Sequence, residues 1–153
     1  MAKKISKSLQ QAIDALVIQD VYVKSCQAQC ADDFDPKSTE LEELLVQQMH
    51  IVHRSELVDI DGDGQLIRIY IRLGARWVNP KEDSDPDIKA FVEADFISEY
   101  QMTAELEQKA IDEFALKNAS YHVWPYWREL LSSQCERLRL PRVVLPTVQF
   151  CKQ

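Results

Sequence analysis

Two pairs of metal-capable side chains are the first candidates for a chemical site: Cys26 with Cys30, and His50 with His53. Thiolates and imidazoles are ligands of tetrahedral zinc, which takes four of them. Each pair lies in a segment with the composition of a β-strand, where side chains alternate between the two faces of a sheet. A spacing of three therefore places His50 and His53 on opposite faces. We expect no zinc site, no other metal and no cofactor.

A run of acidic residues and glycines, Asp59-Ile-Asp-Gly-Asp-Gly64, matches the first half of a calcium-binding loop. Alternate carboxylates in such a loop supply oxygen ligands around a glycine turn. The loop also needs a bidentate glutamate at its twelfth position, which is Tyr70 in this chain. The flanking segments have the composition of strands and not of helices. The run therefore predicts a hairpin turn.

Nucleophilic catalysis finds little support in the residue types. A cysteine or serine could still meet a histidine in the folded chain, since such partners come together in space rather than in sequence. The chain nevertheless has no nucleophile elbow and no glycine-supported oxyanion loop, and it contains only three histidines. Its three glycines also exclude a glycine-rich phosphate loop and a dinucleotide-binding fingerprint. We expect that the protein is not an enzyme.

The segment Tyr121-His-Val-Trp-Pro-Tyr-Trp127 contains four aromatic residues in seven positions. A helix in so small a domain cannot bury side chains on every side of one turn. We expect at least two of these aromatics to pack in the core, and some of Trp124, Tyr126 and Trp127 to lie in a groove or interface. Aromatic side chains in a groove bind apolar segments without requiring a particular sequence.

The net charge and the short apolar clusters argue against a nucleic-acid partner and against membrane insertion. Twenty-five acidic residues against 18 basic ones give a formal net charge of −7. A field of this sign repels phosphates, so we expect no nucleic-acid partner. The lysines near the N-terminus are not followed by the apolar stretch of a signal peptide, and the longest apolar cluster is too short to span a bilayer. We expect a cytoplasmic protein without membrane insertion, whose four cysteines are reduced.

The 153 residues suit one domain with a core of its own. Residues 1–12 are polar and rich in lysine, and we expect a flexible N-terminal arm there, followed by a single domain over 13–153. The predicted strands cover 15–30, 44–58, 67–77 and 88–99; one predicted helix has Thr103 as its N-cap and closes at 117–120, and a second runs from Pro125 to just before Pro141. The order ββββαα predicts an α+β fold, in which the helices pack apart from a four-stranded antiparallel sheet.

The faces of the strands indicate how they pair. In the third strand the odd positions from Ile67 to Trp77 are apolar, and the even positions carry three arginines. The fourth strand has acidic residues on one face, so a hairpin of the two would pair arginines with carboxylates. The second strand alternates between two sets, which are Leu45, Met49 and Ile51 on one face and Gln48, His50 and Arg54 on the other. The first strand is partly apolar on both faces, so we expect it either to meet protein on both sides or to pair its edge with another subunit, and we expect an oligomer.

The C-terminal part of the chain resembles a known family. The segment from Val123-Trp-Pro-Tyr-Trp-Arg-Glu129 to Pro141-Arg-Val-Val-Leu-Pro-Thr-Val-Gln-Phe150 resembles the C-terminal signature of the SecB export chaperone family. In that family a Phe/Tyr-Pro-Tyr-x-Arg-Glu segment opens the long second helix, and a Pro-x-x-x-Leu-x-Pro-Val-x-Phe segment follows it. The stretch Leu16-Val-Ile-Gln-Asp-Val-Tyr-Val-Lys24 is similar to the family's first strand. The element order, the length and the acidic charge agree over nearly the whole chain.

The resemblance implies a chaperone that holds non-native polypeptides without ATP (a holdase) and assembles as a homotetramer, a dimer of dimers. Its clients lie in hydrophobic grooves formed by the connection between the first two strands and by the second helix. Carried over to this chain, the client-binding residues are Phe34, Leu41, Leu44, Trp124, Tyr126, Trp127, Leu130, Leu138, Leu140 and Val144. The first strands and first helices form the subunit interfaces, which here implies Val21, Tyr22, Val23, Leu106, Ala110 and Phe114.

The resemblance also bears on the client. Export chaperones of the family present acidic side chains on the outer face of the first strand to the SecA motor, and the matching positions here are Ser25 and Gln29. SecB-like proteins of toxin–antitoxin–chaperone systems, some of them anti-phage, instead hold an aggregation-prone extension of an antitoxin. We therefore expect a dedicated antitoxin chaperone. Two alternatives remain open: a general export chaperone that delivers preproteins to SecA and the Sec translocase, and an oligomeric interaction protein without chaperone activity.

Overall fold

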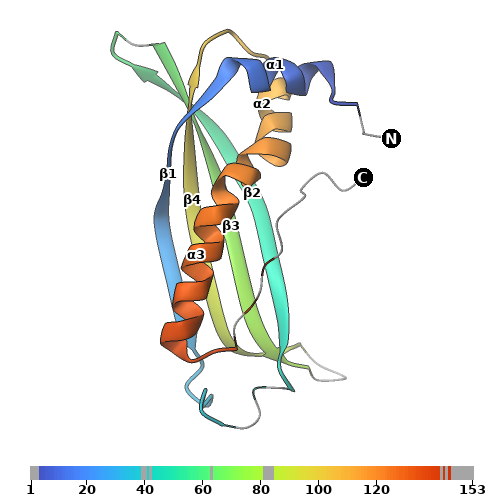
Figure 1. The fold of residues 1–153 in the computed structure, drawn as a ribbon, viewed down its shortest axis with the longest axis vertical. Helices are drawn as coiled ribbons and strands as arrows, with labels where there is room; N and C mark the ends of the chain where they lie inside the picture. The colour runs from blue at the N-terminus through green and yellow to red at the C-terminus, as the bar shows by residue number, and fades with distance from the viewer. Residues whose placement is uncertain are drawn as a thin grey trace.

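Four long strands and a C-terminal helical segment make up most of the chain (Figure 1). The computed structural model describes residues 4–38, 41, 43–62, 64–80, 85–141, 143 and 145. The elements are helix α1 (Lys7–Ala15), strands β1 (Leu16–Cys30), β2 (Leu45–Ile60), β3 (Gly64–Asn79) and β4 (Asp87–Met102), helix α2 (Gln108–Phe114), the π-helical turn η2 (Ala115–Ala119) and helix α3 (Ser120–Leu138). The four predicted strands are confirmed, and the last three extend a few residues beyond their predicted bounds.

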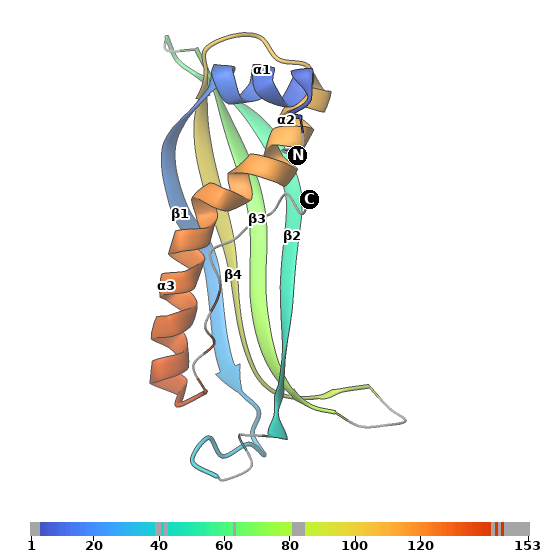
Figure 2. The same ribbon diagram turned by 45° about the vertical axis from the view of Figure 1, so that its right-hand side comes forward.

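The strands form one antiparallel sheet in the order β1-β4-β3-β2. β1 and β2 are therefore the edges of the sheet. The helices all lie on one side of the sheet, and no helix of the described residues lies on the other side (Figures 1 and 2). We call the side that the helices cover the inner face and the opposite side the outer face. The α+β class with a four-stranded antiparallel sheet is confirmed.

The central hairpin of β3 and β4 pairs arginines with carboxylates, as the sequence predicts. Arg68 lies opposite Glu99, and Arg72 lies opposite Asp95. Arg68 Nε donates to Glu99 Oε2 at 2.7 Å, and Arg72 donates to both carboxylate oxygens of Asp95 at 2.8 and 3.0 Å. The Arg72 guanidinium holds the pKa of Asp95 below its usual value. A shift of one residue would turn these charges towards the core, so the predicted pairs help to set the register.

The core lies between the inner face and the helices. The odd-numbered side chains of β3 from 67 to 77 are buried, as their alternation predicts. Trp127 of α3 meets Phe96 of β4 edge-to-face, with ring centroids 6.5 Å apart. Nearer α2, Phe114 meets Tyr100 in the same way at 4.9 Å. Each buried side chain of this size contributes about 1.5–3 kcal/mol, so this layer fixes the helical segment on the sheet.

Helix α1 occupies part of the region where a flexible arm is expected, so the prediction for residues 1–12 is wrong from Lys7 onward. Ser6 is the N-cap, and its Oγ accepts a hydrogen bond from Leu9 N at 3.1 Å. Leu9 and Ala12 are buried, and α1 packs against α2. These residues form a short apolar stripe with helical spacing, which the polar, lysine-rich composition of the segment does not indicate. A helix of nine residues is stable only through such packing, which a local composition does not reveal.

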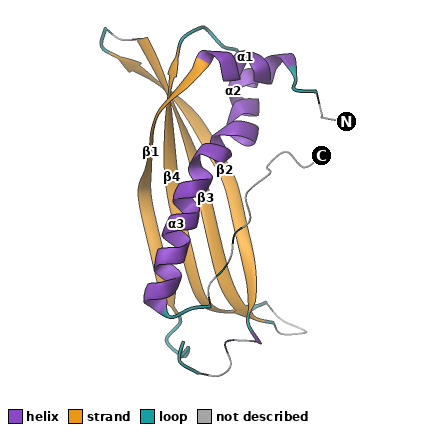
Figure 3. Ribbon diagram, viewed as in Figure 1, coloured by secondary structure: helices purple, strands orange, loops and turns teal. Residues whose placement is uncertain are grey.

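The predicted break between two C-terminal helices is also wrong. α2, η2 and α3 form one uninterrupted helical segment over residues 108–138, about 45 Å long (Figure 3). Pro125 lies inside α3. Thr103 caps no helix, because α2 begins only at Gln108 and has Glu107 as its N-cap; Thr103 Oγ1 instead donates to Ala15 O at 3.0 Å. Buried side chains, Val123 among them, follow one side of the whole segment. This packing outweighs the N–H that the proline cannot donate.

Strand β2 contains a β-bulge at His53, where its pairing with β3 shifts between Val52 and Arg54. Before the bulge, the two faces follow the predicted alternation. Beyond the bulge the faces exchange, so Arg54 lies opposite Tyr70 on the outer face. The prediction that Arg54 shares a face with His50 is therefore wrong.

Candidate functional site

Helix α3 carries several of the residues expected to bind a client. Trp124, Leu130 and Leu138 are half-buried and pack against the edge of the core. Tyr126 is 51% exposed. With 3.6 residues per turn, Trp124 lies on one side of the buried stripe of α3, and Tyr126 and Leu130 lie on the other side. The structure thus divides the predicted helix residues between two borders of the buried stripe.

Trp127 and Leu140 are core residues in this structure. Trp127 is only 2% exposed. Leu140 is buried because the chain turns back after α3: Arg139 adopts a left-handed conformation with a φ of 59°, and Leu140 N donates to Cys135 O at 2.9 Å. Neither side chain reaches the surface in this conformation, so we leave both out of the candidate surface. Val144, the last predicted member, lies outside the described residues.

The connection between β1 and β2 supplies the other predicted residues. Phe34, Leu41 and Leu44 are all half-buried. The start of the connection is anchored to β4, because Lys89 Nζ lies 2.9 Å from Asp33 Oδ2. A backbone hydrogen bond of 3.0 Å closes a turn at Phe34. These contacts hold the aromatic ring in place beside the sheet.

The connection and the C-terminal end of α3 lie at the same end of the molecule in both views (Figures 1 and 2). Trp124 precedes Leu138 by almost four turns, which places it roughly 20 Å away along the helix. The candidate surface is therefore a long one and not a single pocket. We call it the helix–connection surface, and its members are Phe34, Leu41, Leu44, Trp124, Tyr126, Leu130 and Leu138.

Sequence reasoning missed two apolar side chains on the inner face of the edge strand β2. Val46 and Leu57 lie opposite the buried residues Trp77 and Ile67, and both nevertheless remain exposed, Leu57 at 52%. The alternation of the strand could have identified Val46. Leu57 reaches the inner face only because the bulge exchanges the faces, and no local pattern indicates that exchange.

The residues expected at subunit contacts differ in exposure. Buried within this chain are Val21, Ala110 and Phe114; Tyr22 and Leu106 are half-buried; and Val23 is exposed. Phe114 already packs on Tyr100 of its own chain. Val23, which is 42% exposed at the sheet edge, is the member with the most surface to offer another subunit.

Two histidines form hydrogen bonds between the helical segment and the sheet. His50 Nε2 lies 2.7 Å from Ser120 Oγ, and His122 Nδ1 lies 2.7 Å from the Tyr100 hydroxyl. Burial lowers the pKa of both histidines and raises the pKa of Tyr100. The uncharged forms are therefore favoured, and both pairs are suited to holding the helix on the sheet.

The other chemical candidates do not converge on a site. β2 and β3 pair antiparallel up to Ile60 and Gly64, and Gly62 and Gly64 have φ values of 83° and 91°, so the predicted hairpin turn is confirmed. Burial raises the pKa of the Cys26 and Cys30 thiols. In the part of the chain that the structure describes, no three His, Cys, Asp or Glu side chains gather closely enough to hold a metal ion. None of the described helices combines the length and the apolar composition that crossing a membrane requires.

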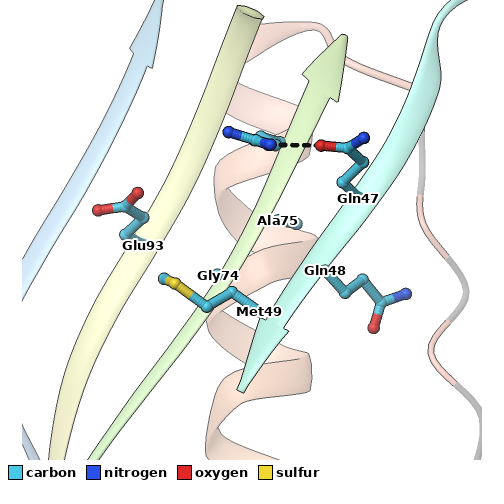
Figure 4. A pocket seen from close by; sticks show the side chains of 7 residues that line it. Gln47, Gln48, Met49, Gly74, Ala75 and Glu93 are labelled. Atoms are coloured by element: carbon cyan, nitrogen blue, oxygen red, sulfur yellow. Dashed lines mark hydrogen bonds between the residues drawn. The ribbon is translucent and has the colours of Figure 1, made fainter. Parts of the chain in front are cut away.

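The outer face has an open hollow of about 410 Å³ over Gly74 (Figure 4). Gly74 lies between Met49 of β2 and Glu93 of β4, and a Cβ at this glycine would come within 2.9 Å of Met49 Cε. Beside it, Arg76 Nε donates to Gln47 Oε1 at 2.7 Å. The lining residues are Gln47, Gln48, Met49, Gly74, Ala75, Arg76 and Glu93. None of the predicted client-binding residues is among them.

No family model matches the chain, and no curated protein matches it. Among solved structures, the chain is similar to the SecB-like chaperone Rv1957 of Mycobacterium tuberculosis, which was solved in complex with a ChAD peptide from the antitoxin HigA1 (Rv1956). The TM-score is 0.73 at 16% identity, and the match covers 94% of this chain and 98% of that one. A protein of unknown function from Streptococcus agalactiae matches with a TM-score of 0.38 at 11% identity, over 86% of this chain and 96% of that one.

Proposed function

From its SecB-like fold, we propose that this protein is a chaperone that holds an unfolded polypeptide without ATP, as the dedicated partner of an antitoxin. The observation that carries the proposal is the structural likeness to a SecB-like chaperone solved with an antitoxin peptide, over 94% of this chain. The chaperone acts in the cytoplasm as a homotetramer of single-domain subunits. Its activity depends on apolar surface and not on catalysis or a cofactor.

The helix–connection surface supports polypeptide binding. Its aromatic and aliphatic side chains are half-buried or exposed, so an unfolded segment can cover them and gain about 25 cal/mol for each Å² of apolar area removed from water. The effect has no direction and makes little demand on the sequence of the client. Tyr126, Leu130 and Leu138 follow one border of the buried stripe over roughly 18 Å, which corresponds to about five residues of an extended chain.

The outer face of β1 supports an antitoxin client over export preproteins. Ser25 lies on this face, where its Oγ donates to Asp95 Oδ2 at 2.9 Å, and Gln29 lies opposite Phe91 on the same face. Neither position carries a charge, whereas export members of the family present carboxylates there to the SecA motor. We therefore propose that SecA is not a partner of this chain.

Suppression of aggregation tests the chaperone proposal. We expect the purified protein to suppress the light scattering of a reduced, unfolded model protein in the absence of ATP. Trp124→Ala and Tyr126→Ala are the diagnostic variants, because their side chains lie on opposite borders of the buried stripe. We expect the loss of an aromatic contact to weaken client affinity by about tenfold. A loss confined to one variant assigns the client to that side of α3.

Leu116→Ala is the matched control, since it removes an exposed aliphatic side chain of η2 that lies outside the helix–connection surface. Trp127→Ala is unsuitable as a probe, because emptying a core site of this size costs about 3–5 kcal/mol of folding stability. Circular dichroism verifies that each variant is folded. A wild-type protein that leaves scattering unchanged would refute the chaperone and favour an oligomeric interaction protein.

A further inference from the structure

We propose that Lys24, Arg54 and Tyr70 form a docking site for an acidic peptide segment on the outer face of the sheet. Arg54 Cζ lies 4.2 Å from the centroid of the Tyr70 ring, and Lys24 Nζ lies 5.4 Å from the same centroid. Both cations are exposed at their own strands, while Tyr70 is half-buried. The Tyr70 ring on the central strand β3 thus lies close to one positive charge from each edge strand.

Two irregularities of the sheet bring these charges together. The bulge at His53 moves Arg54 from the inner to the outer face, opposite Tyr70. Lys24 is the residue at which the pairing of β1 with β4 shifts, between Val23 and Ser25. β1 has no contact with β3 in the strand order, so the Lys24 side chain reaches across β4 to the ring. Bulges that redirect side chains are frequent next to binding sites.

The two positive charges are only partly compensated where they meet, because a single carboxylate, that of Glu56, is bound at the ring. Their distances to one centroid place them within about 10 Å of each other, roughly one Debye length at 0.1 M salt, so they repel. Among the described residues, neither Lys24 nor Arg54 forms an ion pair. The Glu56 carboxylate accepts the hydrogen bond of the Tyr70 hydroxyl at 2.7 Å and offsets one of the two positive charges, which leaves the other for an incoming carboxylate.

Two further arginines of this region are already in ion pairs. Arg68 is paired with Glu99, and Arg72 is paired with Asp95, so they add little net field at the ring. An incoming carboxylate between Lys24 and Arg54 would therefore relieve the repulsion between these two cations. A hydrogen bond from either cation to a carboxylate is charge-assisted and stronger than one between neutral groups.

A peptide fits this site better than a nucleic acid does. The formal net charge of −7 opposes a polyanion that extends over the surface, whereas a short acidic segment meets the two cations at close range. Ile51 of β2 is exposed on the same outer face and offers apolar contact to such a segment. The site lies on the opposite side of the sheet from α3, so it does not rest on the proposed client-holding function.

Fluorescence anisotropy of a labelled hexaglutamate peptide tests the site in the full-length protein at low salt. We expect the wild-type protein to bind the probe. Lys24→Gln and Arg54→Gln should each weaken binding by about five- to tenfold, since each removes one charge-assisted contact. Tyr70→Phe retains the ring and should retain binding, whereas Tyr70→Leu should weaken it.

Arg128→Gln is the matched control, because it makes the same change of net charge at an exposed position of α3. Equal losses in Arg128→Gln and Arg54→Gln would show that the probe senses only the overall charge and would overturn the proposal. A wild-type protein that does not bind hexaglutamate would also overturn it. Tighter binding of an oligothymidylate through the same residues would replace the peptide by a nucleic acid and refute the assignment.

Discussion

At the scale of single residues, the hydrogen bond between Tyr100 and His122 joins α3 to the central strand β4. The His122 ring also lies against Phe114, with centroids 6.3 Å apart, so it belongs to an aromatic cluster at the edge of the core. Burial lowers the pKa of His122. The unfolded chain therefore binds a proton at this residue more readily than the folded chain does, and acidification favours unfolding.

This imbalance predicts a pH dependence. We expect the free energy of unfolding to fall as the pH decreases through the ordinary histidine pKa of about 6.5, with a slope from His122 of at most about 1.4 kcal/mol per pH unit. Urea denaturation between about pH 7 and about pH 5 measures the effect. His122→Gln should flatten the dependence, while His53→Gln, which removes an exposed histidine at the bulge, is the control. Equal slopes in the wild type and in His122→Gln would contradict the assignment.

At the scale of elements, the edge strand β1 has two valines on its inner face that differ in exposure. Val21 is 8% exposed and belongs to the core, whereas Val23 is 42% exposed. A charge at Val21 would be buried and would unfold the chain. A loss of assembly in such a variant could then not be distinguished from a loss of folding. Val23 is the position at which an edge-to-edge interface can be tested without loss of the fold.

We expect Val23→Asp to lower the oligomeric state while the far-ultraviolet circular dichroism stays unchanged, because a charge at an apolar interface is costly to bury. Size-exclusion chromatography with light scattering measures the mass. Leu57→Asp places the same charge on the other edge strand, at a side chain of similar exposure, and should leave the assembly intact. Dissociation by Leu57→Asp with no effect of Val23→Asp would place the interface at β2 and not at β1.

At the scale of the whole molecule, the sheet separates two surfaces of different character. The inner face carries the helices and the helix–connection surface, which is apolar. The outer face carries paired arginines and carboxylates, together with the two cations at Tyr70. The two proposed binding sites therefore lie on opposite sides of one sheet, so that neither blocks the other.

Affinity capture of the tagged protein from its own cells tests which client this arrangement serves. We expect one small partner, retained through a single terminal segment, because the outer face of β1 has uncharged Ser25 and Gln29 where an export chaperone presents acids. The Tyr126→Ala variant shows whether retention depends on the helix–connection surface. Recovery of many signal-bearing precursors together with the translocase motor would contradict the dedicated role.

The sequence by itself determined the strands, the α+β class and the pairing of arginines with acids across the central hairpin. The alternation from Ile67 to Trp77 places one apolar face and one arginine face on β3, and the acids of β4 lie opposite the arginines once the two strands pair. These features are local, because side chains in a strand alternate with a period of two and opposite charges attract at short range. The resemblance at residues 123–150 indicated the SecB-like fold that the comparison supports.

Only the tertiary structure decided which side chains reach the surface. Trp127 and Tyr126 are adjacent in one aromatic segment, yet one is 2% and the other 51% exposed. Likewise, the helix continues through Pro125, Leu9 of α1 is buried, and the bulge at His53 turns Arg54 outward. Each outcome depends on what another part of the chain covers or pairs with. Burial depends on contacts between residues that are far apart in the sequence, so a short stretch of neighbouring residues does not determine it.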